Sequence, residues 1–337
     1  TGFTVFGPKL RFIGFIDLGL EAIMFCASVF CWRVLTPELR LRYRDIDWSI
    51  LKPIFKMSTW TLVNRLGSIL FLRSDIWIIN RFISPIAAGQ YAAILVIANF
   101  IRQMASQASG QLAPTIMNFW AKEELDHLRR LLSFSVKMLS FGLAIPVGLI
   151  CINGGEVLGV WLDERFVHLS TLLLVLTIHM PINTGVLPLF SLNTASNSVR
   201  IPALVTFAMG ALNIALSYLL GVTFEYGPIG VALATAIVMT LKNAFFIPIY
   251  GATVLQLPRR AFLGSTFGCL LMLGLVYLLA LIPIRGWLNL EAPGFAGLAV
   301  QGVFVGGVCA LLGWFVLVTK EDKQVLTACF RKKSAAK

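Results

Sequence analysis

The sequence predicts an all-α protein, a polytopic transmembrane helical bundle of about nine spans. About nine apolar stretches run from Phe12 to Thr319, and a helix of roughly 20 residues at 1.5 Å per residue crosses a hydrocarbon core of ~30 Å. Hydrophobic residues make up 58% of the chain and charged residues 13%, which suits lipid as the solvent. Backbone N–H and C=O groups cannot stay unpaired in lipid, so these stretches must fold as helices.

The boundaries of the predicted spans come from the apolar runs and from the turn-forming residues between them. Pro85 with Gly89, Gly227 with Pro228, and Pro258 each separate two apolar runs. The predicted spans are 12–34, 57–82, 87–113, 131–153, 168–193, 201–224, 227–253, 261–283 and 295–319.

The distribution of Lys and Arg predicts the orientation. After the first span, alternate loops are rich in basic residues, and the intervening loops hold few. Basic loops face the cytoplasm, so we expect a bacterial cytoplasmic (inner) membrane protein with a cytoplasmic C-terminus and an external residue 1. Lys9 and Arg11 run against this pattern. The basic set comprises Arg40, Arg42, Arg44, Lys52, Lys56, Lys122, Arg129, Arg130, Lys137, Arg200, Arg259, Arg260, Lys320, Lys323, Arg331, Lys332, Lys333 and Lys337.

An external start without a start Met or a signal peptide leads us to expect that the chain is the C-terminal part of a longer protein. The formal charge of +12 lies in loops and in the tail, so it does not indicate a nucleic-acid partner. The six Cys have no metal-ligand spacing, and we expect neither a metal nor a cofactor. The stretch 36–56 alternates basic and apolar residues, which fits an amphipathic linker on the inner leaflet or a plain solvated connector.

Several short motifs follow one another along the chain. They are Ser74–Ile83 with Ala88–Ala92, Gln111–Thr115, Ala121–Glu124, Leu128–Arg130, Gly155–Leu162, Leu192–Asn197 with Pro202, and Gly227–Ala236. Their order resembles that in the polysaccharide flippases of the multidrug/oligosaccharidyl-lipid/polysaccharide exporter superfamily. The run Ser74–Ile83 followed by Ala88–Ala92 is similar to the start of that family's second six-helix half.

The resemblance implies a domain organisation. Residues 1–35 would hold the last helix of a truncated N-terminal lobe, 36–56 the linker, and 57–255 a complete six-helix C-terminal lobe like that of multidrug exporters. Residues 256–319 would be an extra helix pair, and 320–337 a basic cytoplasmic tail. The resemblance also implies two lobes that face each other across a central cavity with alternating access.

Ionisable residues inside spans are the main clues to a site, because lipid tolerates them only next to protein, water or a partner. Cations outnumber acids there, which predicts a cationic cavity for an anionic substrate; Arg suits bidentate phosphate contact. The candidate substrate-binding residues are Arg65, Arg73, Arg102, Lys242, Asn64, Gln103 and Asn243. The candidates for ion or proton coupling are Asp75 and His179.

Structural explanations for the same residues stay open at this point. Arg73 and Asp75 are compatible with the outer interface, where Arg snorkels. Arg102 is compatible with a structural ion pair to Asp75, and His179, which lies just before Pro181, with a satisfied helix break.

Three functions fit the sequence. The first is a flippase that moves lipid-linked oligosaccharide of the undecaprenyl-pyrophosphate type for surface polysaccharide (O-antigen, capsule or exopolysaccharide) biosynthesis. Its partners would be that substrate, membrane lipids and polysaccharide polymerase or export proteins. The second is a multidrug or cation antiporter of the same superfamily, and the third a non-transporting scaffold or remnant in a polysaccharide-synthesis complex. We expect no enzyme, because nucleotide-binding, zinc-protease and Rossmann motifs are absent from the sequence.

Overall fold

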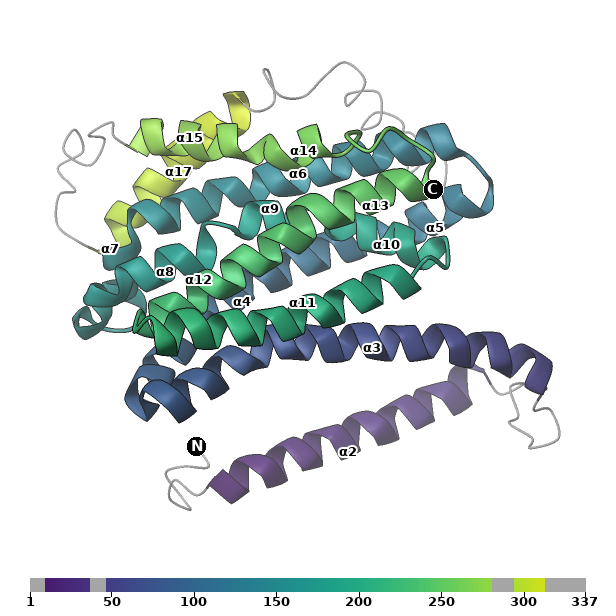
Figure 1. Ribbon diagram of the computed structural model, residues 1–337, viewed down its shortest axis with the longest axis horizontal. Coiled ribbons are helices and arrows are strands. Elements are labelled where there is room, and N and C mark those ends of the chain that lie inside the picture. The colour runs from purple at the N-terminus through teal and green to yellow at the C-terminus, as the bar shows by residue number, and fades with distance from the viewer. Residues whose placement is uncertain (1–9, 37–46, 281–293, 313–337) are drawn as a thin grey trace. The chain divides into compact units, whose positions relative to one another are not determined.

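The computed structural model describes residues 10–36, 47–280 and 294–312, and every regular element in this part of the chain is a helix (Figure 1). Eight of these helices are long and apolar enough to cross a membrane. Nine spans were predicted, and the difference is the predicted span 57–82. It is helical, but it carries Arg65, Arg73 and Asp75 and is too polar to count among the eight.

The chain divides into an N-terminal unit, Thr1–Lys56, and a C-terminal unit, Met57–Lys337. The first contains α2 (Leu10–Leu35) and the first turns of α3 (Trp48–Ile78). Because α3 runs through residues 56 and 57 without a break, the boundary predicted there between linker and lobe lies inside one helix. Residues 37–46 of the predicted linker, 281–283 and 313–319 of the last two spans, and the tail at 320–337 lie outside the described residues.

The C-terminal unit continues from α3 through helices that pass up and down the bundle. The first four are η2 (Ile79–Ile83), α4 (Pro85–Gly110), α5 (Ala113–Ala121) and α6 (Leu125–Ile152). They are followed by α7 (Gly154–Trp161), η3 (Glu164–Leu169), α8 (Ser170–Thr177), α9 (Met180–Gly185) and α10 (Leu187–Ala195). The remaining elements are α11 (Arg200–Tyr218), η4 (Leu219–Thr223), α12 (Gly227–Thr240), η5 (Leu241–Phe246), α13 (Ile247–Val254), α14 (Leu263–Phe267), α15 (Cys269–Ala280) and α17 (Phe295–Leu312).

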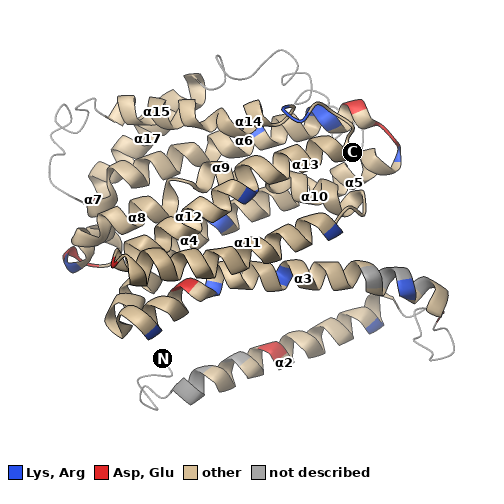
Figure 2. Cartoon of the chain, in the orientation of Figure 1, with Lys and Arg blue, Asp and Glu red and all other residues tan. Residues whose placement is uncertain are grey.

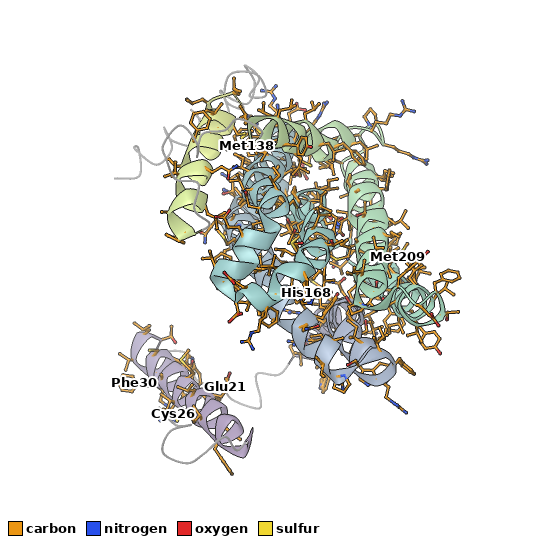
Figure 3. The ribbon with its side chains drawn as sticks, turned by 90° about the vertical axis from the view of Figure 1, so that its left-hand side faces the viewer. Glu21, Cys26, Phe30, Met138, His168 and Met209 are labelled. Atoms are coloured by element: carbon orange, nitrogen blue, oxygen red, sulfur yellow. The ribbon has the colours of Figure 1, made fainter. Side chains whose placement is uncertain are left out.

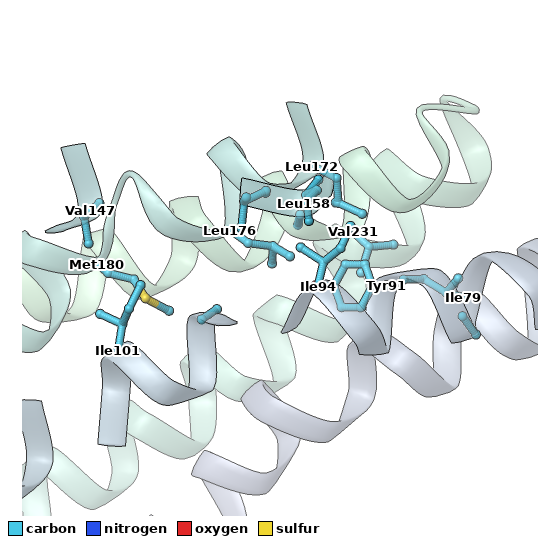
Figure 4. Packing of buried hydrophobic residues seen from close by; sticks show 14 of the residues in the cluster. Ile79, Tyr91, Ile94, Ile101, Val147, Leu158, Leu172, Leu176, Met180 and Val231 are labelled. Atoms are coloured by element: carbon cyan, nitrogen blue, oxygen red, sulfur yellow. The ribbon is translucent and has the colours of Figure 1, made fainter. Parts of the chain in front are cut away.

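Helix α6 organises the apolar core of this unit, because it contributes to all three clusters of buried side chains. Val147 packs with α4, α8 and α12 in the first cluster, part of which is shown in Figure 4. Leu132 packs with α10 and α13 in the second, and Phe141 with α15 and α17 in the third. Figure 3 views this unit from the end that carries His168, with Met138 of α6 toward the top and Met209 of α11 toward the right.

Helices α3 and α11 cross at two glycines. A Cβ on Gly67 would lie 2.7 Å from the backbone N of Phe207, and a Cβ on Gly210 would lie 2.7 Å from the Gly67 carbonyl oxygen. Only residues without a side chain allow this close backbone approach. The crossing keeps one face of α3 turned into the bundle.

The basic residues of the C-terminal unit follow the alternation that the sequence predicts. The turns α5–α6, α10–α11 and α13–α14 lie at one end of the bundle, and the turn after α7 lies at the other (Figure 1). Charged residues colour the ribbon at these ends, and others lie between them (Figure 2).

Candidate functional site

Asp75 is the centre of a buried hydrogen-bond network near the end of α3. Its Oδ2 accepts hydrogen bonds from Tyr91 Oη at 2.9 Å and from Thr235 Oγ1 at 2.8 Å, and its Oδ1 accepts one from Asn213 Nδ2 at 3.3 Å. Thr235 Oγ1 also lies 3.1 Å from Asn213 Oδ1. We call Asp75, Tyr91, Asn213 and Thr235 the aspartate network. It joins α3, α4, α11 and α12, so a single carboxylate ties four helices together.

Apolar side chains seal the aspartate network. Ile79, Ile94 and Val231 lie next to the Tyr91 ring (Figure 4), and only 4% of the Asp75 surface is exposed. The hydroxyl of Ser217, one turn beyond Asn213 on α11, is also buried and makes no hydrogen bond with the described residues. An acid buried in a membrane-spanning helix suits a site that a proton or a small cation enters, whereas the three donors, which stabilise the charged carboxylate, suit a structural tie.

Arg102 of α4 lies at the edge of the interior. It interacts electrostatically with Asp75, His179 and Lys242, although it makes no hydrogen bond to any of them. Its Nη1 donates a long hydrogen bond of 3.4 Å to Asn99 Oδ1, and its Nε is buried without a partner among the described residues. The guanidinium therefore has unused hydrogen-bonding capacity.

Next to Arg102, helix α4 exposes a polar face. Asn99, Gln103, Ser106 and Gln107 are exposed and follow one another at spacings of three, four or one residues, so they share one side of the helix. The neighbouring exposed side of α4 is apolar and carries Val96, Phe100 and Met104. Polar side chains midway along a membrane-spanning helix need water or a partner. The polar face of α4 (Asn99, Gln103, Ser106 and Gln107) is therefore the surface in this unit most suited to a hydrophilic cavity.

Lys242 lies inside the bundle. It is 7% exposed, and its Nζ lies 5.2 Å from the Phe71 ring centroid and 5.6 Å from that of Phe190. Its segment η5 is a π-helix that precedes Pro248. Because Pro248 cannot donate to the carbonyl four residues earlier, the helix widens ahead of it. Cation–π contacts thus replace water around this ammonium.

A second polar group surrounds the break in the predicted span 168–193. The structure divides that span at Ile178–His179 and at Val186, next to Pro181 and Pro188. Asn183 Nδ2 lies 2.8 Å from His179 Nδ1 and donates to Thr240 Oγ1 at 3.1 Å, and Asn243 Nδ2 donates to the Asn183 carbonyl at 3.0 Å. His179, Asn183, Thr240 and Asn243 form the histidine network, which fastens the broken segment to η5.

The predicted site residues thus separate into two groups. Asp75, Arg102, His179, Lys242 and Asn243 come together in or beside the interior networks. Arg65 and Arg73 lie on the exposed side of α3, and Gln103 on the exposed side of α4. Asn64 is half-buried, and its Oδ1 lacks a partner among the described residues. Asp75 and Arg73, only two residues apart, lie on opposite sides of α3.

Sequence reasoning missed Asn213 and Thr235 as partners of Asp75, and it missed Asn99 and Ser106 on α4. Asn99 and Ser106 could have been predicted, because polar residues at three- and four-residue spacing in an apolar span indicate one polar helix face. Nothing local marks Thr235, one of two threonines in the apolar helix α12.

Three further observations concern a surface turn, metal binding and the cysteines. In the turn after α7, the Arg165 backbone N–H and guanidinium donate to Asp163 Oδ1 at 3.0 and 3.1 Å and keep the pKa of Asp163 below its usual value. Within the described residues, no three His, Cys, Asp or Glu side chains are placed to hold a metal ion. Of the cysteines, Cys269 and Cys309 are buried, whereas Cys26 and Cys31 are exposed on α2.

The comparisons with known proteins are sparse. The chain is 28% identical over 339 residues to the "uncharacterized membrane protein EpsK" of Bacillus subtilis, an alignment that covers 99% of this chain and 66% of the relative. The chain therefore spans just under two thirds of that relative's length. No protein-family model and no solved structure matches it. The chain is a multi-pass helical membrane protein, homologous to this EpsK protein.

Proposed function

We propose that this chain takes part in flipping an anionic, lipid-linked oligosaccharide of the undecaprenyl-pyrophosphate type across the bacterial cytoplasmic membrane by alternating access. The observation that carries the proposal is the polar face of α4 with Arg102 at its edge, in a helix long enough to span the membrane. A lipid-linked glycan has a polar head that must cross while its apolar tail stays in the bilayer. A polar helix face with a cation at its edge, within a lipid-embedded bundle, meets that need.

The charges on α3 support an anionic head group. Arg65 and Arg73 are exposed on the C-terminal unit and make no hydrogen bond or ion pair with the described residues. Among all residues of α3 and α4, the only acid is Asp75, which is buried. Guanidinium groups pair with the two oxygens of a phosphate in a planar geometry.

Asp75 supplies a coupling site in this proposal, with His179 as the second candidate. Burial away from water disfavours the charged carboxylate, so a proton or a monovalent cation that neutralises Asp75 would link transport to an ion gradient. In the cell, the partners would be the glycan-lipid, membrane lipids and polysaccharide polymerase or export proteins.

The buried acid also fits the cation antiporter considered above. Such an antiporter needs acids on the surfaces that meet its substrate, whereas the exposed sides of α3 and α4 carry Arg and amides. Transport of an organic cation by the purified protein would favour the antiporter over the flippase.

The test uses chromosomal replacement in the native host, followed by measurement of surface polysaccharide. Arg65→Ala, Arg73→Ala and Arg102→Ala should each lower export by about tenfold, because a hydrogen bond to a charged group contributes ~1.5–3 kcal/mol. Arg130→Ala, an exposed arginine near the start of α6, is the matched control. Normal export in all three variants at equal membrane levels would reject the proposal and favour a scaffold.

A further inference from the structure

Arg102 occupies a position between the buried aspartate network and the polar face of α4. Its side chain is half-buried, with Nε inside and Nη1 reaching Asn99 on the exposed side. The 3.4 Å bond to Asn99 is too long to fix the guanidinium firmly. Arg102 therefore has access to both regions and is held strongly by neither.

The attraction between Arg102 and Asp75 acts through space. Three donors already occupy the Asp75 carboxylate, and Arg102 is not among them, so its interaction with Asp75 is electrostatic. Such an attraction depends on the charge of Asp75 and vanishes when that charge is neutralised.

Other groups near Arg102 push it the opposite way. Lys242, from η5, repels the guanidinium, and His179, from the turn before α9, would do so when protonated. Tyr91, on the same helix as Arg102, is neutral and donates to Asp75. With Asp75 charged, attraction and repulsion oppose each other; with Asp75 neutral, only repulsion from the interior is left.

We infer that Arg102 transmits the charge state of Asp75 to the polar face of α4. When Asp75 is negative, Arg102 is drawn toward the interior and is poorly placed for an anionic ligand. When a cation neutralises Asp75, Arg102 turns to the polar face and binds the anionic head group. Linkage makes the effect reciprocal, so the bound anion in turn favours the cation at Asp75. This inference rests on the proposed function and adds the residue that couples its two sites.

The experiment measures binding of farnesyl pyrophosphate to the full chain in detergent, by isothermal titration calorimetry. Each protein is titrated with and without sodium at alkaline pH, and then at acidic pH without sodium. The unmodified chain should bind about tenfold more tightly when Asp75 is neutralised. The condition that produces the gain distinguishes sodium from the proton.

Variants locate the coupling. Asp75→Asn should bind tightly under every condition, and Arg102→Gln weakly under every condition. Arg102→Lys keeps a cation, so its affinity for the pyrophosphate should still depend in part on neutralisation of Asp75. A purely structural role of Arg102 would not predict this partial recovery. Lys242→Met removes the repulsion from that ammonium and should reduce the gain in affinity on neutralisation of Asp75. Arg130→Gln serves as the control and should behave like the unmodified chain.

The outcomes separate the two ideas. If Arg102→Gln still binds more tightly when sodium or protons are added, Arg102 does not couple the sites, and the proposed function is unaffected. If the unmodified chain binds no pyrophosphate under any condition, the proposed function fails, whatever Arg102 does. Melting curves identify a variant that fails to bind because it is unfolded. If Asp75→Asn is unfolded, the comparison of Arg102→Gln with Arg102→Lys is sufficient to test whether Arg102 couples the two sites.

Discussion

The interior of the C-terminal unit and the exposed sides of α3 and α4 handle membrane-embedded charge in opposite ways. Inside, Asp75 has three hydrogen-bond donors and Lys242 lies between two aromatic rings. Outside, Arg65 and Arg73 have no such partners among the described residues. Charges that hold a fold together are satisfied by it, whereas charges that serve a ligand leave their capacity free. The comparison indicates that the two groups should respond differently to mutation.

The largest loss of stability should follow Asp75→Ala. It leaves the Tyr91, Asn213 and Thr235 donors without their acceptor in the interior, at a cost of about 3 kcal/mol or more. Thermal unfolding in detergent measures it. Asp75→Asn retains an acceptor oxygen and should lose less; equal melting temperatures for Ala, Asn and the unmodified chain would show that the network is not a structural tie.

The next largest loss of stability should follow substitution of the glycines at which α3 crosses α11. Gly67→Ala or Gly210→Ala places a Cβ against backbone atoms and should cost about 1–3 kcal/mol. Gly142→Ala is the control, because nothing lies within 4 Å of its added Cβ. If all three variants unfold at one temperature, the close crossing does not orient α3.

A smaller change is expected for Lys242→Met. The apolar chain fills the same slot between Phe71 and Phe190, and only cation–π contacts of ~0.5–2 kcal/mol are lost, offset by the removal of a buried charge. Stability should shift by about 1 kcal/mol in either direction. A collapse of the fold would reveal a partner of the ammonium that is stronger than the two rings.

The smallest effect on stability should come from the exposed positions. Arg73→Ala and Gln103→Ala should stay within about 0.5 kcal/mol of the unmodified chain. The measurement that distinguishes the two exposed sides of α4 is access to water. Gln103→Cys should react with a membrane-impermeant thiol reagent much faster than Phe100→Cys, once the reaction of the native cysteines has been subtracted. Equal rates would mean that the two exposed sides of α4 share one environment.

Local sequence signals were sufficient to predict the helices but not the contacts between side chains in the interior. The spans 201–224 and 227–253 match Arg200–Thr223 and Gly227–Val254 within a few residues, because apolar runs and Gly-Pro boundaries act locally. Helix α3 begins at Trp48, within the stretch 36–56 that the alternation of basic and apolar residues predicted as a linker. The breaks around His179 had a local marker in Pro181, but the fastening of that segment to η5 had none.

The sequence alone determined that the chain is a membrane-embedded helical bundle and which spans carry charge, since lipid forces apolar runs into helices and makes each ionisable residue conspicuous. Only the tertiary structure decided that Asp75 faces inward and Arg73 outward, because that depends on how α3 crosses α11 at Gly67 and Gly210. It also decided the partners of Asp75, which include Asn213 and Thr235, 138 and 160 residues further along the chain. No local pattern specifies such pairs, because they exist only once separate helices have packed side by side.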